Sequence, residues 1–372
     1  MALISKPTPF FESQNEIGAS FGDVNGWSVP FVYSNESEEY SAALERVILY
    51  DQSPTGRVWI SGSDGPDLLN RLSTNLVDPI SVGSVVSTVL TNNKGRIIDA
   101  IKIVKLDEGL LILTSPQRRE AVVDWINKYT IVEDIEVVDF TESSAMLTLI
   151  GPCSEISLLN LLQLSSLDFK SCQTIEVFWR GQNIIIIQSA SFSIPAFDII
   201  VPSDKAKGLW EDIITSSGDV GLTLAGEKAI EILRIQNRIP KWGSELGPEY
   251  NPIEAGLTAS ISWSKGCYIG QEVIARLWTY QKIQKYLVGI AFDSPLAPLV
   301  GSDLRIKEKK VGILTSASFH PTEGKYWGLG YLKSSEARIG SVVDVATDSD
   351  SIASGEIIAI PEIPSHQTPQ LL

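Results

Sequence analysis

Residues 265–272 read KGCYIGQE and bring a thiol, an ammonium group, a carboxylate and two glycines into one short segment. Glycine is favoured where the backbone takes a positive φ or approaches a ligand closely, which suits Gly266 and Gly270 to a tight loop. A cysteine flanked by a lysine is expected to ionise more readily than a buried structural cysteine. Cys267 and Lys265 are therefore candidates for a reactive centre. Taken alone, Cys267 also fits a small buried residue in an ordinary turn.

The composition indicates a globular protein of two or three lobes. The chain has 372 residues, of which 44% are hydrophobic, and so exceeds the size at which one core usually stops growing. Its 30 Lys and Arg against 45 Asp and Glu give a net charge of −15, which argues against nucleic acid as a main partner. No apolar run approaches the length of a membrane span, so no membrane partner is expected.

The rare residue types exclude several kinds of site. Three widely spaced cysteines, Cys153, Cys172 and Cys267, fit neither a disulfide framework nor a zinc site and indicate a reducing compartment. Only two histidines, His320 and His366, are present, so no metal site and no Ser-His-Asp triad is expected. His320 precedes a proline and is predicted to lie in a surface turn. The first residues resemble neither a signal peptide nor a transit peptide, so any such segment is expected to have been removed.

The hydrophobic pattern predicts α+β lobes followed by a small barrel. A helix is expected from the Asn35 cap through Val47, and strands at 85–90, 97–106 and 110–113 form an antiparallel meander. Further helices are predicted at 68–72, 118–129, 154–162, 204–215 and 223–235, and further strands at 57–60, 146–150, 183–188 and 258–263. This mixed order is typical of α+β lobes rather than a doubly wound sheet.

From residue 286 onward, short strands are separated by glycine, proline and aspartate turns, which predicts a small β-barrel or sandwich. These strands are expected at 286–292, 304–307, 310–317, 325–332 and 342–346. The predicted division is therefore two α+β lobes at 1–285, a barrel at 286–360 and a loose tail at 361–372.

The motif at 265–272 resembles the signature K-G-C-[FY]-x-G-Q-E of the YgfZ/IBA57 family, folate-binding proteins that maintain iron–sulfur enzymes and are related to glycine-cleavage T-protein. Similar segments follow in the same order at 26–33, 50–58, 95–100, 149–152, 233–235 and 252–257. The resemblance implies three lobes around a central folate channel, with the barrel as third lobe. It is strongest to the plastid branch, so the chloroplast stroma is the expected location, with the mitochondrial matrix or a bacterial cytoplasm as alternatives.

Two departures from T-protein bear on activity. T-proteins carry two adjacent aspartates where this chain has Asp99 and Ala100, and a pterin-binding glutamate where this chain has Ile194. The resemblance is therefore to the YgfZ/IBA57 family more than to an active aminomethyltransferase.

Asp99 is predicted to lie on a buried strand face with Ile97 and Ile101, where a carboxylate would be desolvated. Desolvation raises the pKa of a carboxyl group and suits it to hydrogen bonding with a folate. The alternative is an aspartate that caps the turn near Gly95.

The candidate catalytic residues are Cys267, Lys265 and Asp99. Cofactor-binding candidates are Asp99 and Lys265 again, Arg276 for the glutamate tail of a folate, and the aromatic residues Trp278 and Tyr33 beside the pterin. Arg276 on an ordinary solvated face is the alternative.

Three functions follow as hypotheses. The first is a tetrahydrofolate-binding accessory protein of iron–sulfur cluster assembly or repair, with assembly proteins or client iron–sulfur enzymes as partners. The second is a tetrahydrofolate-dependent one-carbon transferase. The third is a non-catalytic scaffold that has lost folate binding.

Overall fold

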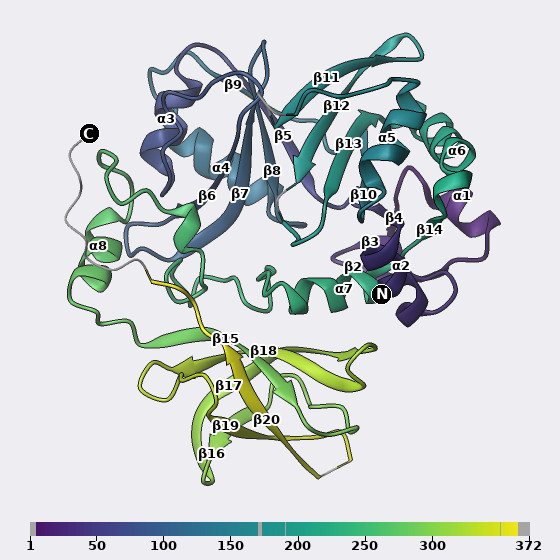
Figure 1. Ribbon diagram of the computed structural model, residues 1–372. Coiled ribbons are helices and arrows are strands. Elements are labelled where there is room, and N and C mark those ends of the chain that lie inside the picture. The colour runs from purple at the N-terminus through teal and green to yellow at the C-terminus, as the bar shows by residue number, and fades with distance from the viewer. Residues whose placement is uncertain (1–4, 170–172, 190, 350, 364–372) are drawn as a thin grey trace. The chain divides into compact units, whose positions relative to one another are not determined.

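The computed structural model describes residues 5–169, 173–189, 191–349 and 351–363, and Figure 1 shows the order of their helices and strands. Two compact units share the chain in alternating segments. The first unit comprises Met1–Gly65, Ile80–Val85 and Lys102–Leu233, and the second comprises Pro66–Pro79, Val86–Ile101 and Arg234–Leu372. The division predicted from the sequence stays a prediction, and most of its tail lies outside the described residues.

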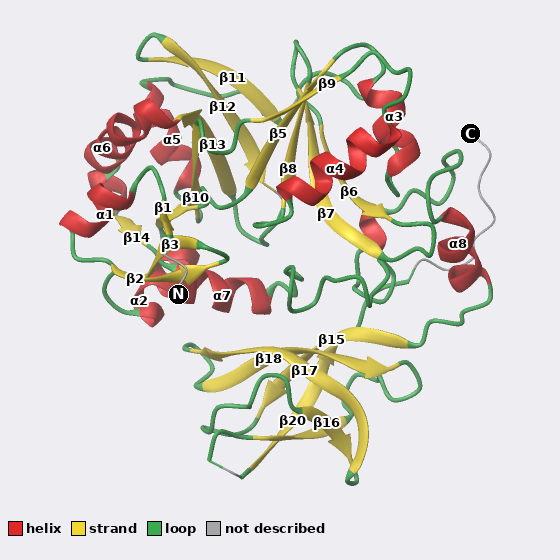
Figure 2. Ribbon diagram, turned by 180° about the vertical axis from the view of Figure 1, so that it is seen from behind, coloured by secondary structure: helices red, strands yellow, loops and turns green. Residues whose placement is uncertain are grey.

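The first unit is built on a six-stranded sheet, visible in yellow in Figure 2. Its strands, in spatial order, are β11 (Thr174–Trp179), β12 (Gln182–Ser189), β13 (Ala196–Pro202), β10 (Ser144–Ile150), β4 (Val47–Asp51) and β14 (Leu222–Leu224). Helices α5 (Ser154–Leu162) and α6 (Ala206–Ser216) pack on one face over Leu147, Leu149 and Ile199. Since side chains alternate along a strand, the intervening residues of β10 and β13 point to the opposite face.

Helix α2 (Glu36–Glu45) and helix α7 (Glu227–Gln236) contribute to a second cluster that includes Ile48 and Ile150. The predicted cap at Asn35 is confirmed, because its Oδ1 accepts hydrogen bonds from the backbone N–H groups of Ser37 and Glu38. The predicted extension of this helix to Val47 is wrong. Val47 begins β4, since its β-branched side chain joins the sheet core.

The sequence interpretation missed the N-terminal part of this unit. Here a three-stranded sheet has the order β1 (Lys6–Pro7), β3 (Trp27–Val32), β2 (Ser20–Val24), and the short helix α1 (Phe11–Glu16) follows β1. A two-residue strand and a six-residue helix are too short to produce a recognisable hydrophobic period.

A five-stranded sheet confirms the predicted meander, with the order β6 (Val85–Thr91), β7 (Ile97–Lys105), β8 (Leu110–Thr114), β5 (Gly56–Ser61), β9 (Glu136–Asp139). Residues 97, 99, 101 and 103 of β7 are buried and alternate with partly exposed residues. The predicted buried face of this strand is therefore correct. Helices α3 (Gly65–Leu72) and α4 (Arg119–Tyr129) also form where helices were expected.

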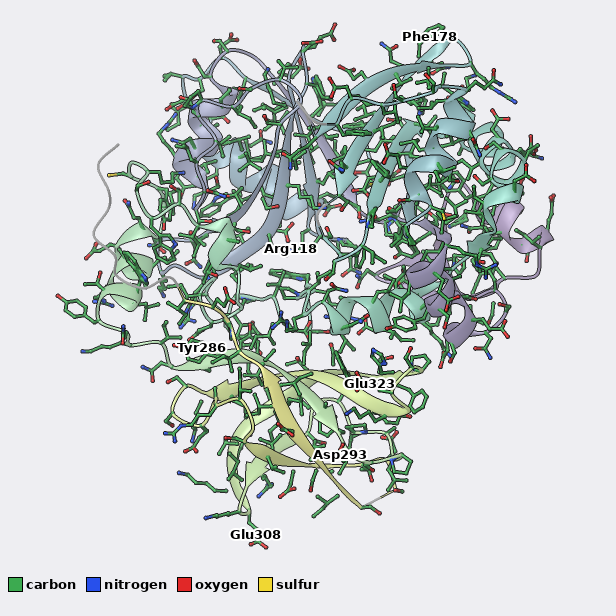
Figure 3. All side chains as sticks on the ribbon, viewed as in Figure 1. Arg118, Phe178, Tyr286, Asp293, Glu308 and Glu323 are labelled. Carbon is green, nitrogen blue, oxygen red and sulfur yellow. The ribbon has the colours of Figure 1, made fainter. Side chains whose placement is uncertain are left out.

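The second unit contains a closed barrel of six strands, which confirms the predicted C-terminal β-barrel (Figure 1). The strands are β15 (Lys285–Phe292), β18 (Lys325–Lys333), β17 (Lys309–His320), β16 (Asp303–Ile306), β19 (Val342–Ala346) and β20 (Ile352–Ala359). Strand β20 was not predicted, because small residues such as Ala353 and Gly355 stand among its inward positions. Figure 3 labels Glu308 at the tip of the β16–β17 hairpin.

Two predictions for this unit are wrong. Residues 258–263 form no strand: a single 3₁₀ turn at Thr258–Ser260 is followed by a loop. His320 is not a surface turn residue but is buried at the end of β17, with its ring centroid 4.6 Å from that of Trp327. Burial lowers the pKa of His320. Apolar packing against the tryptophan outweighs the turn tendency of the following proline.

Candidate functional site

The loop at residues 265–270 precedes helix α8 (Gln271–Thr279), labelled in Figure 1. Lys265 and Tyr268 are buried, while the two residues between them, Gly266 and Cys267, are exposed. The loop therefore has two buried anchors and an exposed thiol at its tip.

Lys265 is the principal anchor of this loop. Its Nζ donates hydrogen bonds to the backbone carbonyls of Asn70 at 2.6 Å, Ser73 at 2.9 Å and Asn75 at 2.6 Å. These carbonyls lie at and just beyond the C-terminus of α3, where backbone acceptors lack helical partners and a cation is favoured. Burial lowers the pKa of Lys265 to about 8, so the amine still carries its charge at pH 7.

Two further contacts and one backbone conformation hold the rest of the loop. The Ile269 N–H donates to the carbonyl of Arg71, and the Thr91 hydroxyl donates to the carbonyl of Ile269 at 2.6 Å. Gly270 has φ +87°, and a Cβ at that position would lie 2.6 Å from the Asn92 carbonyl oxygen. Only glycine fits this conformation and this space. The loop is thus fixed on both sides of its exposed tip.

The contacts of Lys265 bear on its predicted catalytic role. An ammonium group has three N–H donors, and all three of the donors of Lys265 are directed to backbone carbonyls. In the described part of the chain, no hydrogen bond or ion pair joins Lys265 to Cys267. Lys265 therefore has a structural role, and its action on the thiol or on a folate stays a prediction.

Asp99 lies on the buried face of β7 and is fully buried, as expected. Its Oδ1 accepts a hydrogen bond from the Ala100 N–H at 3.0 Å. The alternative role as a turn cap belongs to Asn92, whose Oδ1 accepts from the N–H groups of Lys94 and Arg96. The side chain of Asp99 is therefore not needed to hold that turn.

The positions where T-proteins carry further carboxylates have apolar surroundings in this chain. Ala100 packs against a cluster that contains Tyr250 and Tyr331, two rings stacked at 3.9 Å. Ile194 packs against the cluster beneath α2 and α7. Both side chains thus pack among hydrophobic residues.

Helix α8 carries the other candidates of the second unit. Trp278 packs on Trp263 with ring centroids 4.4 Å apart and belongs to a small hydrophobic cluster. Arg276 and Glu272 are exposed, and no ion pair joins them among the residues that the structure describes. The exposed guanidinium of Arg276 is available to an anionic group. The roles of Trp278 and Arg276 in folate binding stay predictions.

Tyr33 belongs to the first unit and stands beside two carboxylates. Its backbone N–H donates to Glu39 at 2.7 Å, and burial, with the charges of Asp51 and Glu39, raises the pKa of its phenol. Asp51 is itself buried and accepts from Thr8 at 2.6 Å and from Gln14 at 2.9 Å. Tyr33 thus packs against the hydrophobic core of the first unit with two carboxylates nearby, and its contact with a cofactor stays a prediction.

Asp51 and Asp198 are among the buried carboxylates that sequence reasoning missed. Burial raises the pKa of both. Each is a single aspartate within an apolar strand, at 47–51 and 196–202. A charged residue inside a run of buried strand residues is the signal that could have identified both of them.

A further group of polar side chains surrounds Glu254, which lies in the turn before residue 258. Its Oε2 accepts from the Asn251 N–H at 3.3 Å and lies 3.6 Å from Arg96. Burial raises the pKa of Glu254. These contacts are those of a turn-forming residue.

Within the described residues, no group of three or more His, Cys, Asp and Glu side chains is arranged to hold a metal ion. In the same part of the chain, no helix is both long and apolar enough to span a membrane.

The sequence of residues 10–265 matches the family model described as the GCVT N-terminal domain. An Arabidopsis thaliana protein provisionally named as a chloroplastic transferase is 32% identical over 341 residues, which cover 91% of this chain and 77% of that protein. The aminomethyltransferase of Halothermothrix orenii is 26% identical over 96% of this chain and 100% of its own length.

The fold is also that of a solved protein. The crystal structure of the glycine cleavage system aminomethyltransferase T from Bartonella henselae matches 96% of this chain and 97% of its own, with a TM-score of 0.86. At 20% sequence identity, this similarity concerns the fold alone. The expected mixed α and β fold of T-protein type, with its C-terminal barrel, is thereby confirmed.

Proposed function

Because the chain belongs to the GCVT N-terminal domain family, we propose that it binds a reduced folate and acts as an accessory protein of iron–sulfur cluster assembly or repair, of the YgfZ/IBA57 type. The observation that carries this proposal is the loop at 265–270. Its motif is that of the YgfZ/IBA57 signature, and buried contacts on both sides hold the exposed Cys267 thiol in place. Such fixed surroundings are expected for a thiol that acts on a partner or a ligand.

Folate binding is supported by the chemistry of the buried acceptors. The pterin ring of a folate presents N–H donors, which are best received by carboxylates shielded from water. Asp99 in the second unit is such a carboxylate and is completely buried. When bound, a tetrahydrofolate would supply the nitrogens that accept a one-carbon unit. The relatives named as aminomethyltransferases support the same class of cofactor.

The location proposed is the chloroplast stroma, supported by the chloroplastic name of the Arabidopsis relative. The proposed partners are iron–sulfur assembly proteins or client iron–sulfur enzymes. A transferase that acts on a one-carbon unit is the second candidate, favoured by the names of the relatives and disfavoured by the apolar packing at Ala100 and Ile194.

Isothermal titration of the protein with tetrahydrofolate and with 5-formyltetrahydrofolate is expected to give dissociation constants in the micromolar range for at least one of them. The physical reason is that the buried Asp99 carboxylate can accept from the pterin N–H groups, while the exposed Arg276 of the same unit is available to the glutamate tail. If neither compound binds at high micromolar concentration, the accessory and the transferase proposals both fall, and the scaffold hypothesis is favoured.

In an assay with the other glycine-cleavage components, the protein is expected to show no aminomethyl transfer above background. Proton handling at the folate nitrogen is expected to need the second carboxylate, which Ala100 has replaced. Ala100→Asp tests whether the remaining geometry is intact, since a gain of activity would show that only this group is missing. Turnover by the unmodified protein at the rate of a true T-protein would favour the transferase instead.

A further inference from the structure

Strand β11 lies at one edge of the six-stranded sheet of the first unit, beside β12 (Figure 1). The turn at residues 180–181 joins the two strands, and both of its residues have a positive φ. A two-residue turn of this kind makes Trp179 and Gln182 a hydrogen-bonded pair, and such pairs recur at every second residue of the strand. The residues between these pairs, Glu176 and Phe178 among them, therefore direct their N–H and C=O groups away from the sheet.

The backbone of this edge is open at Glu176 and Phe178. At the start of the strand the Thr174 N–H donates to the Gly83 carbonyl at 2.9 Å, which agrees with the alternation. In the described part of the chain, no backbone hydrogen bond beyond the helices and strands involves Glu176 or Phe178. The edge thus offers two N–H donors and two C=O acceptors in the arrangement with which an added strand pairs.

The side chains of these two residues lie on the face of the sheet that is opposite to α5 and α6. Ile175 and Val177 pack against the core beneath those helices, so the alternation of side chains places Glu176 and Phe178 on the other face. Phe178, labelled in Figure 3, is 72% exposed. An exposed aromatic ring beside an open strand edge is the kind of side chain that recognition surfaces use.

Three carboxylates stand near this edge, all in the first unit. Glu176 lies on β11, and the exposed Asp107 and Glu108 form the turn between β7 and β8. Partial burial, followed by the charges of Asp107 and Glu108, raises the pKa of Glu176. Among the residues that the structure describes, no lysine or arginine forms an ion pair with any of the three. Their mutual repulsion is therefore not offset by a cation from this part of the chain.

This charge distinguishes between possible occupants of the edge. Antiparallel pairing of β11 with the same strand of a second copy would bring two such carboxylate groups together, and like charges on adjacent strands are destabilising. A strand with lysine or arginine beside Glu176 would instead be attracted. Its alternate residues would lie beside Ile175 and Val177, which are partly buried hydrophobic residues, and should be apolar.

We propose that the open edge of β11 binds an extended segment of a partner protein in which lysine or arginine alternates with apolar residues. Backbone pairing at Glu176 and Phe178 supplies the affinity, and the two kinds of side chain supply the selectivity. The surface uses none of the residues of the loop at 265–270. The inference is therefore independent of the proposed folate binding.

The probe is a fluorescein-labelled peptide of about eight residues in which lysine and valine alternate, measured by fluorescence anisotropy with the full chain. It is expected to bind at least about tenfold more tightly than a peptide with glutamate in place of lysine. It should exceed to the same degree a peptide with proline in place of valine, which keeps the charge but cannot form a paired strand. Equal affinity for the proline peptide would show charge attraction alone and would overturn the proposal.

Two variants test the edge itself. Phe178→Pro removes an outward N–H but no hydrogen bond to β12, and Glu176→Lys reverses the charge; each should weaken binding of the lysine–valine peptide at least about tenfold. The matched control is Glu16→Lys, an exposed acidic residue at the end of α1 in the same unit, which should leave affinity unchanged. If Phe178→Pro unfolds, Glu176→Lys decides, and its unchanged affinity would overturn the proposal.

Hydrogen exchange locates the bound peptide. The amides of Glu176 and Phe178 should become protected when the lysine–valine peptide is added, whereas those of β14, at the opposite edge of the same sheet, should not. Protection at β14 without protection at β11 would overturn the proposal. Sedimentation of the protein alone provides the remaining test: a dimer that Glu176→Lys dissociates would assign this edge to a second copy of the chain instead of a basic partner.

Discussion

Replacement of Lys265 with methionine is expected to lower the free energy of unfolding by about 3 kcal/mol. Methionine retains much of the buried aliphatic stem but leaves the carbonyls of Asn70, Ser73 and Asn75 without their donor. Chemical denaturation in guanidinium chloride, followed by fluorescence, measures the difference. The effect should be large because these three acceptors lie together at one helix end, and the ammonium group that binds them is itself buried.

The matched control is Lys282→Met, which removes an exposed lysine from the same unit. Its free energy of unfolding should stay within about 0.5 kcal/mol of the unmodified protein. A loss below about 1 kcal/mol for Lys265→Met would show that the loop does not depend on this anchor. In that case the three hydrogen bonds would be dispensable for folding, and a direct role at Cys267 would become the favoured interpretation.

Replacement of Cys267 with serine is expected to abolish the rescue of iron–sulfur enzyme activity in a strain that lacks its own member of the family. Serine keeps approximate size but has no thiolate at neutral pH, so any chemistry of the sulfur is lost. The side chain is exposed, so thermal stability and folate affinity should change little. The measurement is aconitase-type activity in cell extracts, alongside titration and thermal unfolding of the purified variant.

Cys153→Ser serves as the control, because Cys153 is a partly buried cysteine that packs against the core of the first unit. The Cys153→Ser variant should fully restore iron–sulfur enzyme activity in the deficient strain. Two outcomes would refute the role of Cys267: full rescue by its serine variant, or unfolding of that variant, which would make the thiol a packing element. Partial rescue with an intact fold would show that the thiol assists a step that the bound folate mainly carries.

Helices and strands were predicted correctly from the sequence where they are long and their hydrophobic pattern is regular. The meander at 85–114 and five of the six barrel strands were predicted, because alternating side chains and glycine or aspartate turns mark them clearly. Helix α8 was missed, although Gly270 directly before it marks its start. The helix has only nine residues, which is too short for its apolar face to show a clear period in the sequence. The segment at 258–263 was predicted as a strand because it contains residues that favour β-strands. Its first three residues instead form a 3₁₀ turn, so no strand forms there.

The sequence by itself determined the composition of the loop at 265–272, the buried face of β7 on which Asp99 lies, and the α+β character that ends in a barrel. Each of these depends on residues near one another in the chain. Only the tertiary structure decided which groups these side chains form hydrogen bonds with. Lys265 binds carbonyls 190 to 195 residues away, and Asp198 accepts from a threonine 50 residues away. Periodicity indicates which side of an element is buried, but hydrogen-bond partners depend on which distant backbone and side chains the fold brings beside it.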